Sequence, residues 1–293
     1  MLGSLARRDV PIGPLTTYRV GGPAALFVTA DTIEEVGDVA RAVQALDLPV
    51  LVLGKGSNLL VADTGFPGLA LVLGESFAET VVEGTTVRAG GRAALPVVAR
   101  QTAAAGLTGF EWAVGVPGSI GGAVRMNAGG HGSEMAATLV GVRVVDLRTG
   151  HDEQMAASAL DLAYRHSNLA PHQLVIEATL ALRTGDRSES EAAIAEIVRW
   201  RREHQPGGQN AGSVFTNPPG DSAGRLIDAA GCKGLRAGTA VVSSKHANFF
   251  IADDGGRAAD VVALMAEVQR RVLAATGVAL RPETRLIGFE AAP

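Results

Sequence analysis

Residues 115–132 read GVPGSIGGAVRMNAGGHG, and seven of these eighteen positions are glycine. Most of the others are small or apolar, so the stretch has too little side chain to form a core and too little charge to be a solvated linker. Two interpretations fit this composition. The bare backbone either approaches a flat or anionic ligand, or makes a tight corner against another backbone. The residues of the stretch leave both open.

The composition around this stretch is that of a globular protein with about two or three domains or subdomains. The chain has 293 residues, is 47% hydrophobic and carries a formal net charge of -4. This balance disfavours binding to nucleic acid or to an anionic membrane surface. Cys232 is the only cysteine, which excludes an internal disulfide, and the histidines show no metal-ligand spacing. We therefore expect no metal.

The compartment is predicted from what the chain lacks. Residues 1–17 have no apolar core of the kind found in signal peptides, and no later stretch approaches the roughly 20 apolar residues that span a bilayer. We expect a cytoplasmic protein.

Hydrophobic periodicity predicts the order strand, helix, strand and loop in the first part of the chain. A strand over 25–29 precedes an amphipathic helix from 33 to 46, which Thr32 and Glu35 begin with a capping box. The continuous apolar run 49–53 predicts a strand buried on both faces. It leads into GKGSNLL at 54–60, a loop whose amides suit a phosphate. This loop lacks the glycines of both the dinucleotide fingerprint and the P-loop.

The remaining pattern predicts an α+β domain up to about residue 184, followed by a smaller α/β domain. Ser188 and Glu191 resemble a capping box for a helix that ends in a basic turn. The polar loop 205–218 is too long for a simple connector and is a second candidate site. Further elements are a helix at 93–105, strands near 140–145 and 174–182, a helix at 223–230, strands at 239–242 and 248–252, a helix at 257–276 and a return strand within 280–288.

Six motifs occur in an order and spacing that resemble the UDP-N-acetylenolpyruvoylglucosamine reductases, and they cover almost the whole chain. They are TTYRVGG from Thr16, GKGSNLL from Gly54, GVPGSIGGAVRMNAG from Gly115, YRHS from Tyr164, AGSVFTNP from Ala211 and LRPETRLIG from Leu280. The only tyrosines are Tyr18 and Tyr164, and no insertion lies between Glu177 and Trp200. The resemblance is therefore to the shorter type, which lacks a tyrosine-bearing loop that closes over the substrate.

The resemblance implies an α+β fold with an FAD-binding domain of the vanillyl-alcohol oxidase type, built from two α+β subdomains. This domain would span residues 1–185. A smaller substrate-binding domain would span residues 186–293, with its last strand returning to the active site. The implied cofactor is non-covalent FAD, and NADPH is the implied hydride donor. The implied FAD contacts are Arg19, Gly54, Lys55, Gly56, Ser57, Asn58, Gly115, Pro117, Gly118, Ser119, Gly121, Gly122, Asn127, Ala128 and Gly129.

The resemblance also implies a reaction and three catalytic residues. The enolpyruvyl group of UDP-N-acetylglucosamine-enolpyruvate would be reduced to UDP-N-acetylmuramate, a peptidoglycan precursor. Arg165 would stabilise the charge that develops on the substrate carboxylate, because its planar guanidinium can form a fork to it. Ser213 would donate a proton to the α-carbon. Glu283 would complete the carboxylate site, protonated if it shares a hydrogen bond with the intermediate.

The resemblance assigns two substrate contacts, Tyr164 and Asn217, and leaves the diphosphate site open. His204 and Thr216 stand where members of the family often carry lysine. The candidate replacements are Arg201, Arg202, Lys233 and Lys245. His131 stands near the end of the glycine stretch, either as a flat ring beside the ligand or facing solvent.

The expected partner is the small-molecule substrate alone, bound by a monomer without nucleic acid or membrane. The alternatives are another FAD-dependent oxidoreductase on the same scaffold, or a nucleotide- or flavin-binding module without catalysis.

Overall fold

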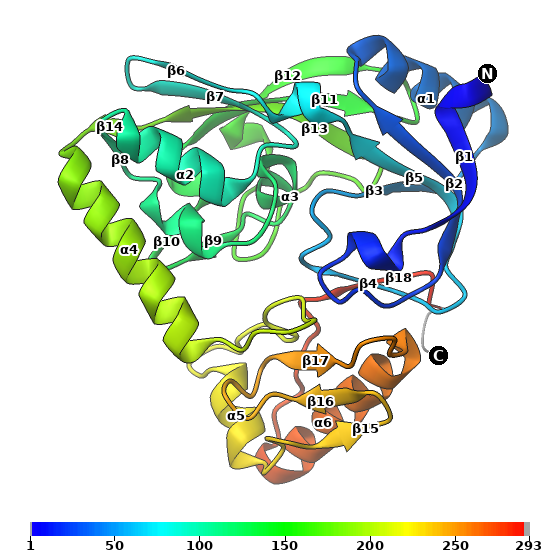
Figure 1. Cartoon of the computed structure of the whole chain (residues 1–293), viewed down its shortest axis with the longest axis vertical. Coiled ribbons are helices and arrows are strands. Elements are labelled where there is room, and N and C mark those ends of the chain that lie inside the picture. The colour runs from blue at the N-terminus through cyan, green and yellow to red at the C-terminus, as the bar shows by residue number, and fades with distance from the viewer. Residues whose placement is uncertain (1, 290–293) are drawn as a thin grey trace. The chain divides into compact units, whose positions relative to one another are not determined.

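The computed structural model describes residues 2–289, which form helices and strands gathered into two compact units (Figure 1). Unit 1 contains residues 2–8, 26–55 and 68–201. Unit 2 contains residues 9–25, 56–67 and 202–289. Each unit therefore combines segments that are distant in sequence. The domain division after residue 185 remains a prediction.

The first sheet of unit 1 has the strand order β1-β2-β5-β3. Its strands are β1 (Ala6–Pro11), β2 (Pro23–Ala30), β5 (Phe66–Leu73) and β3 (Val50–Val52), and helix α1 (Ile33–Leu46) packs against it. Burial of Val36, Val39 and Val43 along one stripe of α1 forms a core with this sheet. Thr32 and Glu35 form the predicted capping box, so the sequence prediction of this helix start is confirmed.

The expectation that residues 49–53 form a strand buried on both faces is wrong. β3 is the edge strand, paired only with the parallel β5, and Leu51 is buried while Val50 and Val52 are half buried. A continuous apolar run indicates burial, but it does not decide whether a strand is central or lies at an edge.

The second sheet of unit 1 is antiparallel and has the order β12-β11-β13-β7-β6. Helices α2 (Leu95–Ala104) and α3 (Ile120–Arg125) share a hydrophobic core with it. Two short pairs join β8 (Leu107–Thr108) to β14 (Arg183–Thr184) and β9 (Gly129–Gly130) to β10 (Ser133–Glu134). The sheet strands are β6 (Thr80–Glu83), β7 (Thr86–Gly90), β11 (Leu139–Asp146), β12 (Asp152–Ala156) and β13 (Gln173–Ala181).

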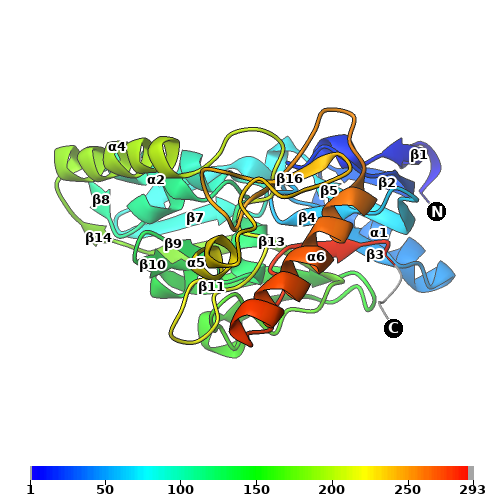
Figure 2. The same ribbon diagram turned by 90° about the horizontal axis from the view of Figure 1, so that it is seen from below.

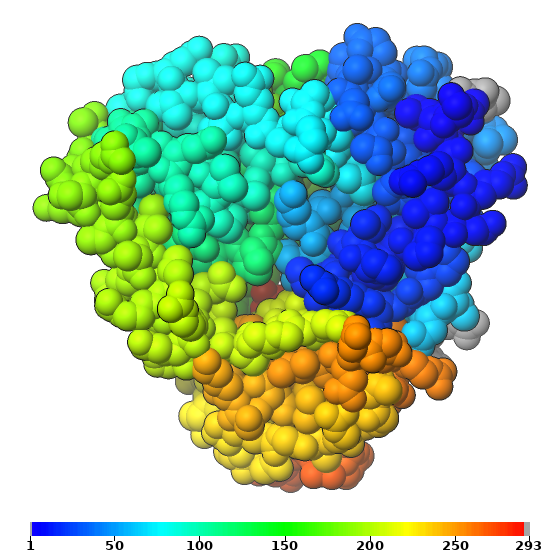
Figure 3. Space-filling model, viewed as in Figure 1, coloured from blue at the N-terminus to red at the C-terminus, as the bar shows by residue number. Residues whose placement is uncertain are grey.

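Helix α4 (Arg187–His204) begins one residue before the predicted Ser188 cap. The side chain of Asp186 accepts hydrogen bonds from Glu189 N at 3.0 Å and from Ser188 Oγ at 2.6 Å, so Asp186 occupies the capping position. Few α4 side chains are fully buried, and in the space-filling view the helix forms an exposed ridge on unit 1 (Figure 3).

Unit 2 combines the C-terminal part of the chain with two earlier segments. Strands β15 (Arg236–Ala237), β16 (Ala240–Val242) and β17 (Phe250–Ala252) form an antiparallel sheet, on which α6 (Ala258–Thr276) packs (Figure 2). Helix α5 (Ala223–Ala229) contacts α6. β18 (Arg285–Ile287) runs parallel to β4 (Leu59–Val61), which confirms the predicted return strand. Across residues 2–289, no helix combines the length and apolar content of a membrane span.

Candidate active site

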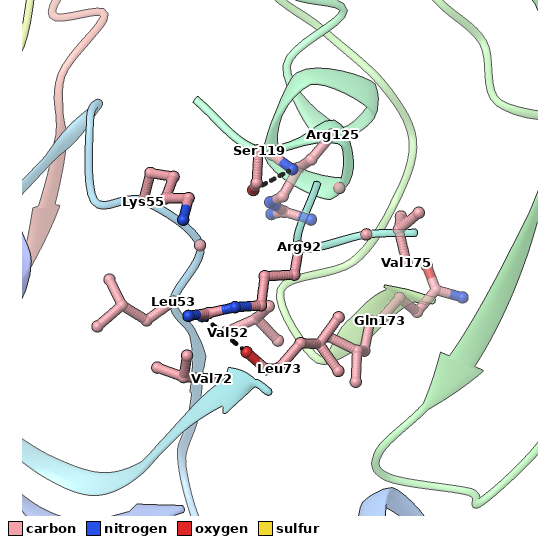
Figure 4. A pocket seen from close by; sticks show the side chains of 15 residues that line it. Val52, Leu53, Lys55, Val72, Leu73, Arg92, Ser119, Arg125, Gln173 and Val175 are labelled. Carbon is pink, nitrogen blue, oxygen red and sulfur yellow. Dashed lines mark hydrogen bonds between the residues drawn. The ribbon is translucent and has the colours of Figure 1, made fainter. Parts of the chain in front are cut away.

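A pocket in unit 1 lies where the two predicted cofactor loops meet (Figure 4). The loop after β3, the end of β5, the turn after β7, the start of α3 and the start of β13 form its walls. The sequence prediction named Gly54, Lys55, Ser119, Gly121 and Gly122, all of which line it. The other lining residues are Val52, Leu53, Val72, Leu73, Gly91, Arg92, Arg125, Gln173, Leu174 and Val175.

The loop 54–58 offers backbone N–H groups to a ligand. Within residues 2–289, no oxygen accepts a hydrogen bond from any of its five amides. Gly56 has a φ of +61°, and a Cβ there would lie 2.6 Å from the carbonyl oxygen of Leu15, so this turn requires glycine. Consecutive amides without protein acceptors, next to the Lys55 ammonium, have the chemistry that binds a phosphate.

The glycine stretch combines the two interpretations that its sequence left open. Ser119 caps α3, and the amides of Ile120 and Gly121 donate to Ala93 O at 2.8 Å and Gly91 O at 2.9 Å. A Cβ on Gly121 would lie 3.2 Å from Gly91 O. This part of the stretch is a corner packed against backbone, and it also forms one wall of the pocket.

Gly115 has a packing role in the structure. A Cβ there would lie 2.6 Å from Cδ2 of His131, whose ring contacts Trp200 edge-on at 5.2 Å between centroids. Burial lowers the pKa of His131, and the positive charge of Arg201 lowers it further. His131 is exposed, and its ring contacts the half-exposed ring of Trp200.

Two arginines at the pocket were missed by the sequence analysis. Arg92 pairs with Glu75, donates to Leu73 O at 2.9 Å, and holds the pKa of Glu75 below its ordinary value through that hydrogen bond. Arg125 donates to the carbonyl oxygens of Leu169 at 2.6 Å and Ala170 at 2.8 Å. For Arg125, its position inside the glycine stretch could have indicated a place at the site. For Arg92 the sequence offered no such indication, because its pairing depends on tertiary contacts.

Asn127 connects the glycine stretch to the loop that carries Tyr164 and Arg165. Its side chain is fully buried, donates to Ala163 O at 3.0 Å and accepts from Ala136 N at 2.9 Å. The predicted contact of Asn127 with FAD would therefore have to come from its backbone.

Arg165 has a backbone φ of +56° and lies against Tyr164, with its guanidinium carbon 5.0 Å from the ring centroid. Its Nη2 donates to Gly129 O at 3.2 Å. Tyr164 is 53% exposed. The structure thus brings the predicted catalytic arginine and the predicted substrate-contacting tyrosine next to the end of the glycine stretch.

Unit 2 brings together the segments that carry Ser213 and Glu283. Val214 O accepts hydrogen bonds from Glu283 N at 2.8 Å and Thr284 N at 3.3 Å. The same pairing continues as a bridge between Phe215 and Pro282. Tertiary folding thus makes two motifs about seventy residues apart into adjacent backbone segments.

Asn58 joins the loop 54–58 to the Glu283 segment. Its Nδ2 donates to Glu283 O at 3.1 Å, and its own carbonyl oxygen accepts from Arg285 N at 3.0 Å. Arg19, also in unit 2, has a φ of +56°. Asn217 Oδ1 accepts from Ala223 N at 3.0 Å, which ties this residue to the start of α5.

Both lysines considered for the substrate diphosphate already make protein contacts. Lys233 Nζ lies 2.7 Å from Asp228 Oδ2, and Lys245 Nζ donates to Arg202 O at 2.5 Å. Burial lowers the pKa of Arg201. In the described part of the chain, His, Cys, Asp and Glu side chains form no group of three that could hold a metal ion.

Two protein families match this chain. The FAD-binding domain family matches residues 24–153, and the C-terminal domain of UDP-N-acetylenolpyruvoylglucosamine reductase matches residues 204–287. The reductase of Heliobacterium modesticaldum is 43% identical over 281 residues, covering 95% of this chain and 89% of the relative. The chain belongs to the UDP-N-acetylenolpyruvoylglucosamine reductase family. The family resemblance inferred from the sequence motifs is thereby confirmed.

Further relatives of this reductase family agree across nearly the full length. The reductase of Paramagnetospirillum magneticum is 44% identical over 285 residues, covering 96% of this chain and 91% of the relative. The crystal structure of the reductase from Thermus caldophilus has 37% identity and a TM-score of 0.85, covering 96% of this chain and 99% of that one. The predicted α+β fold with an FAD-binding domain is confirmed by these matches.

The residues at the pocket fit the FAD that this reductase family uses. The amides of Gly54 and Lys55 and the Lys55 ammonium suit a pyrophosphate, while Val52, Leu53 and Val175 provide apolar walls. A Cβ on Gly54 would lie 2.5 Å from Ser119 Oγ, so a larger residue at this position would displace the Ser119 hydroxyl.

Proposed function

We propose that this chain reduces the enolpyruvyl group of UDP-N-acetylglucosamine-enolpyruvate to give UDP-N-acetylmuramate, a step of peptidoglycan precursor synthesis. NADPH is the hydride donor. The observation that carries this proposal is the pairing of the Ser213 segment with the Glu283 segment, which sets a hydroxyl-bearing residue and a carboxyl-bearing residue on neighbouring strands of backbone. Membership of the reductase family and the match to an FAD-binding domain support it.

FAD, when bound, supplies the two-electron chemistry that transfers a hydride to a carbon–carbon double bond. We assign its pyrophosphate to the loop 54–58 and its remaining contacts to the glycine stretch and Arg19. The amides of the loop donate to no protein oxygen within residues 2–289, so they would be available to donate hydrogen bonds to the pyrophosphate oxygens. The residues assigned to FAD are Arg19, Gly54, Lys55, Gly56, Ser57, Asn58, Gly115, Pro117, Gly118, Ser119, Gly121, Gly122, Asn127, Ala128 and Gly129.

Three side chains manage charge and protons on the substrate. Hydride addition to the β-carbon places negative charge on the carboxylate, where the Arg165 guanidinium can form two parallel hydrogen bonds. The Ser213 hydroxyl donates a proton to the α-carbon, a role open to a weak acid because the intermediate is strongly basic and the geometry is preset. Glu283 completes the carboxylate site. Tyr164 and Asn217 contact the remainder of the substrate.

The same proposal covers organisation and location. Residues 1–185 form the FAD-binding domain, and residues 186–293 form the substrate-binding domain. The enzyme acts in the cytoplasm as a monomer, with neither nucleic acid nor membrane as a partner. Size-exclusion chromatography with light scattering tests the monomer, for which the expected mass is that of one chain.

Visible absorbance of the purified protein tests the main proposal. We expect a flavin spectrum that bleaches anaerobically with NADPH and recovers on addition of UDP-N-acetylglucosamine-enolpyruvate. Bleaching without recovery would mean that the protein is a flavin reductase on this scaffold that acts on another substrate. A protein that binds FAD but is not reduced by NADPH would be a flavin-binding module or would use another donor. Failure to bind added FAD would contradict the whole proposal.

A further inference from the structure

The side chain of Asn248 makes an unusual pair of contacts with the segment that carries Ser213. Asn248 lies between β16 and β17 and is 2% exposed. Its Nδ2 donates to Phe215 O at 2.8 Å, and its Oδ1 accepts from Phe215 N at 3.0 Å. The main-chain oxygen of Asn248 also accepts from Val214 N at 2.9 Å. One residue thus makes three hydrogen bonds to two consecutive residues.

These contacts add to two isolated β-bridges, Ser213 to Phe249 and Phe215 to Pro282. The segment 212–217 lies outside every helix and named strand, and Gly212 at its start has a φ of +74°. An amide side chain that bonds both polar groups of one residue acts like a short piece of neighbouring strand. Because Asn248 is buried, loss of its amide would leave the Phe215 N–H and C=O without these partners.

The Glu283 segment pairs with the same segment through the main-chain oxygen of Val214. Val214 N is held by Asn248, while Val214 O accepts from Glu283 N at 2.8 Å. The Phe215 side chain is fully buried and packs on Phe250, with the ring centroids 5.9 Å apart. The segment is therefore fixed from two sides, with Asn248 on one and the Glu283 segment on the other.

We infer that Asn248 is a positioning residue for Ser213, and that its side chain sets the place of the Ser213 hydroxyl through the backbone of Phe215. The inference rests on the proposed function for the role of Ser213. A displacement of about 1 Å in a reacting group can cost about a hundredfold in rate. Loss of Asn248 should therefore slow the proton-donating half of the reaction and spare the half that does not use Ser213.

The first test compares the two half-reactions in stopped-flow experiments on the FAD-loaded protein. We expect Asn248→Ala to slow reoxidation by UDP-N-acetylglucosamine-enolpyruvate at least tenfold and to change reduction by NADPH less than about threefold. Val268→Ala is the matched control, because Val268 is fully buried in the same unit 2 core and makes none of these hydrogen bonds. It should lower thermal stability without separating the two half-reactions.

A double-mutant cycle distinguishes positioning from a general loss of structure. In a Ser213→Ala background, Asn248→Ala should slow reoxidation by less than about twofold further, because its effect passes through the missing hydroxyl. Equal slowing of both half-reactions, or full additivity with Ser213→Ala, would overturn the inference.

Amide hydrogen exchange tests the contact independently of the reaction. We expect the Phe215 amide to exchange at least tenfold faster in Asn248→Ala, because it loses its side-chain acceptor, with no such change in Val268→Ala at matched stability. Unchanged protection would overturn the inference even if activity fell. If the wild-type protein failed to reduce the enolpyruvyl substrate, the proposed function would fall, and faster exchange would still establish that Asn248 holds this segment.

Discussion

Three predicted site residues adopt a backbone conformation that favours glycine. The φ values of Arg19, Asn127 and Arg165 are +56°, +37° and +56°. Such conformations cost a non-glycine residue on the order of 1–3 kcal/mol and persist only where the surrounding structure enforces them. For Asn127 the enforcement is visible, since both polar ends of its buried side chain are hydrogen bonded. The sequence gives no sign of this, because none of the three is glycine.

Ser213→Ala should separate the two halves of the proposed reaction. Reduction by NADPH should remain nearly unchanged, while reoxidation by the enolpyruvyl substrate should slow by about 10²–10⁴-fold, the usual contribution of a general acid. Stopped-flow absorbance measures both steps. Ser158→Ala, at an exposed serine, should leave both rates unchanged. Equal losses in both steps would reject proton donation by Ser213.

His246 should make the protein less stable in acid. Burial lowers the pKa of its imidazole, whose Nδ1 accepts from Asn248 N at 3.3 Å. As the pH falls below about 6.5, the unfolded chain binds the proton first, so the free energy of unfolding decreases until the folded pKa is reached. His246→Gln should therefore show a shallower decrease between pH 7 and pH 5.

Urea unfolding at several pH values measures this difference. The decrease should shrink without disappearing in His246→Gln, because burial also lowers the pKa of His131. Above pH 8 both histidines are neutral in the folded and unfolded states, so the two stability curves should run parallel there. Parallel curves across the whole range would show that His246 does not contribute.

At the scale of secondary structure, periodicity and capping patterns predicted most of the helices. They could not decide which of two neighbouring residues caps a helix, or whether a strand lies at the edge of its sheet. Both Asp186 and Ser188 are good N-cap residues, and each has a glutamate three positions later. The structure selects Asp186, where the chain leaves β14. Likewise, the apolar run of β3 indicated burial, but only the strand order places it at an edge.

The choice of cap can be measured by urea unfolding. Asp186→Ala should lower the unfolding midpoint more than Ser188→Ala, because the Asp186 carboxylate accepts from both Glu189 N and Ser188 Oγ. Thr32→Ala, which removes the capping box of α1, serves as the reference and should cost about 1 kcal/mol. A larger effect from Ser188→Ala would restore the cap predicted from sequence.

At the scale of the whole molecule, each compact unit is assembled from distant segments. Unit 2 joins residues 9–25 and 56–67 to the C-terminal part of the chain, and the parallel pair β4 and β18 supplies one of the links within it. Residues 54–58 stand where the chain passes from unit 1 to unit 2, and a cofactor bound to their amides would bind only the folded chain.

Removal of FAD should therefore destabilise the entire protein. A ligand present at about a hundred times its dissociation constant adds about 2.7 kcal/mol of stability, which for a protein of this size corresponds to a shift in Tm of roughly 5–10 °C. Scanning calorimetry of the FAD-loaded protein and the apoprotein measures this shift. Equal Tm values in saturating FAD and without it would contradict binding to the folded state.

The sequence by itself determined the family, most strands and the helices other than α3, because periodicity, caps and ordered motifs are carried by residues close together along the chain. Tertiary structure alone decided that Asp186 caps α4, that β3 is an edge strand, and that Asn248 holds the Ser213 segment. These features depend on which distant segments become neighbours. A buried amide can satisfy its hydrogen bonds with many backbone partners, and only the path of the folded chain selects one.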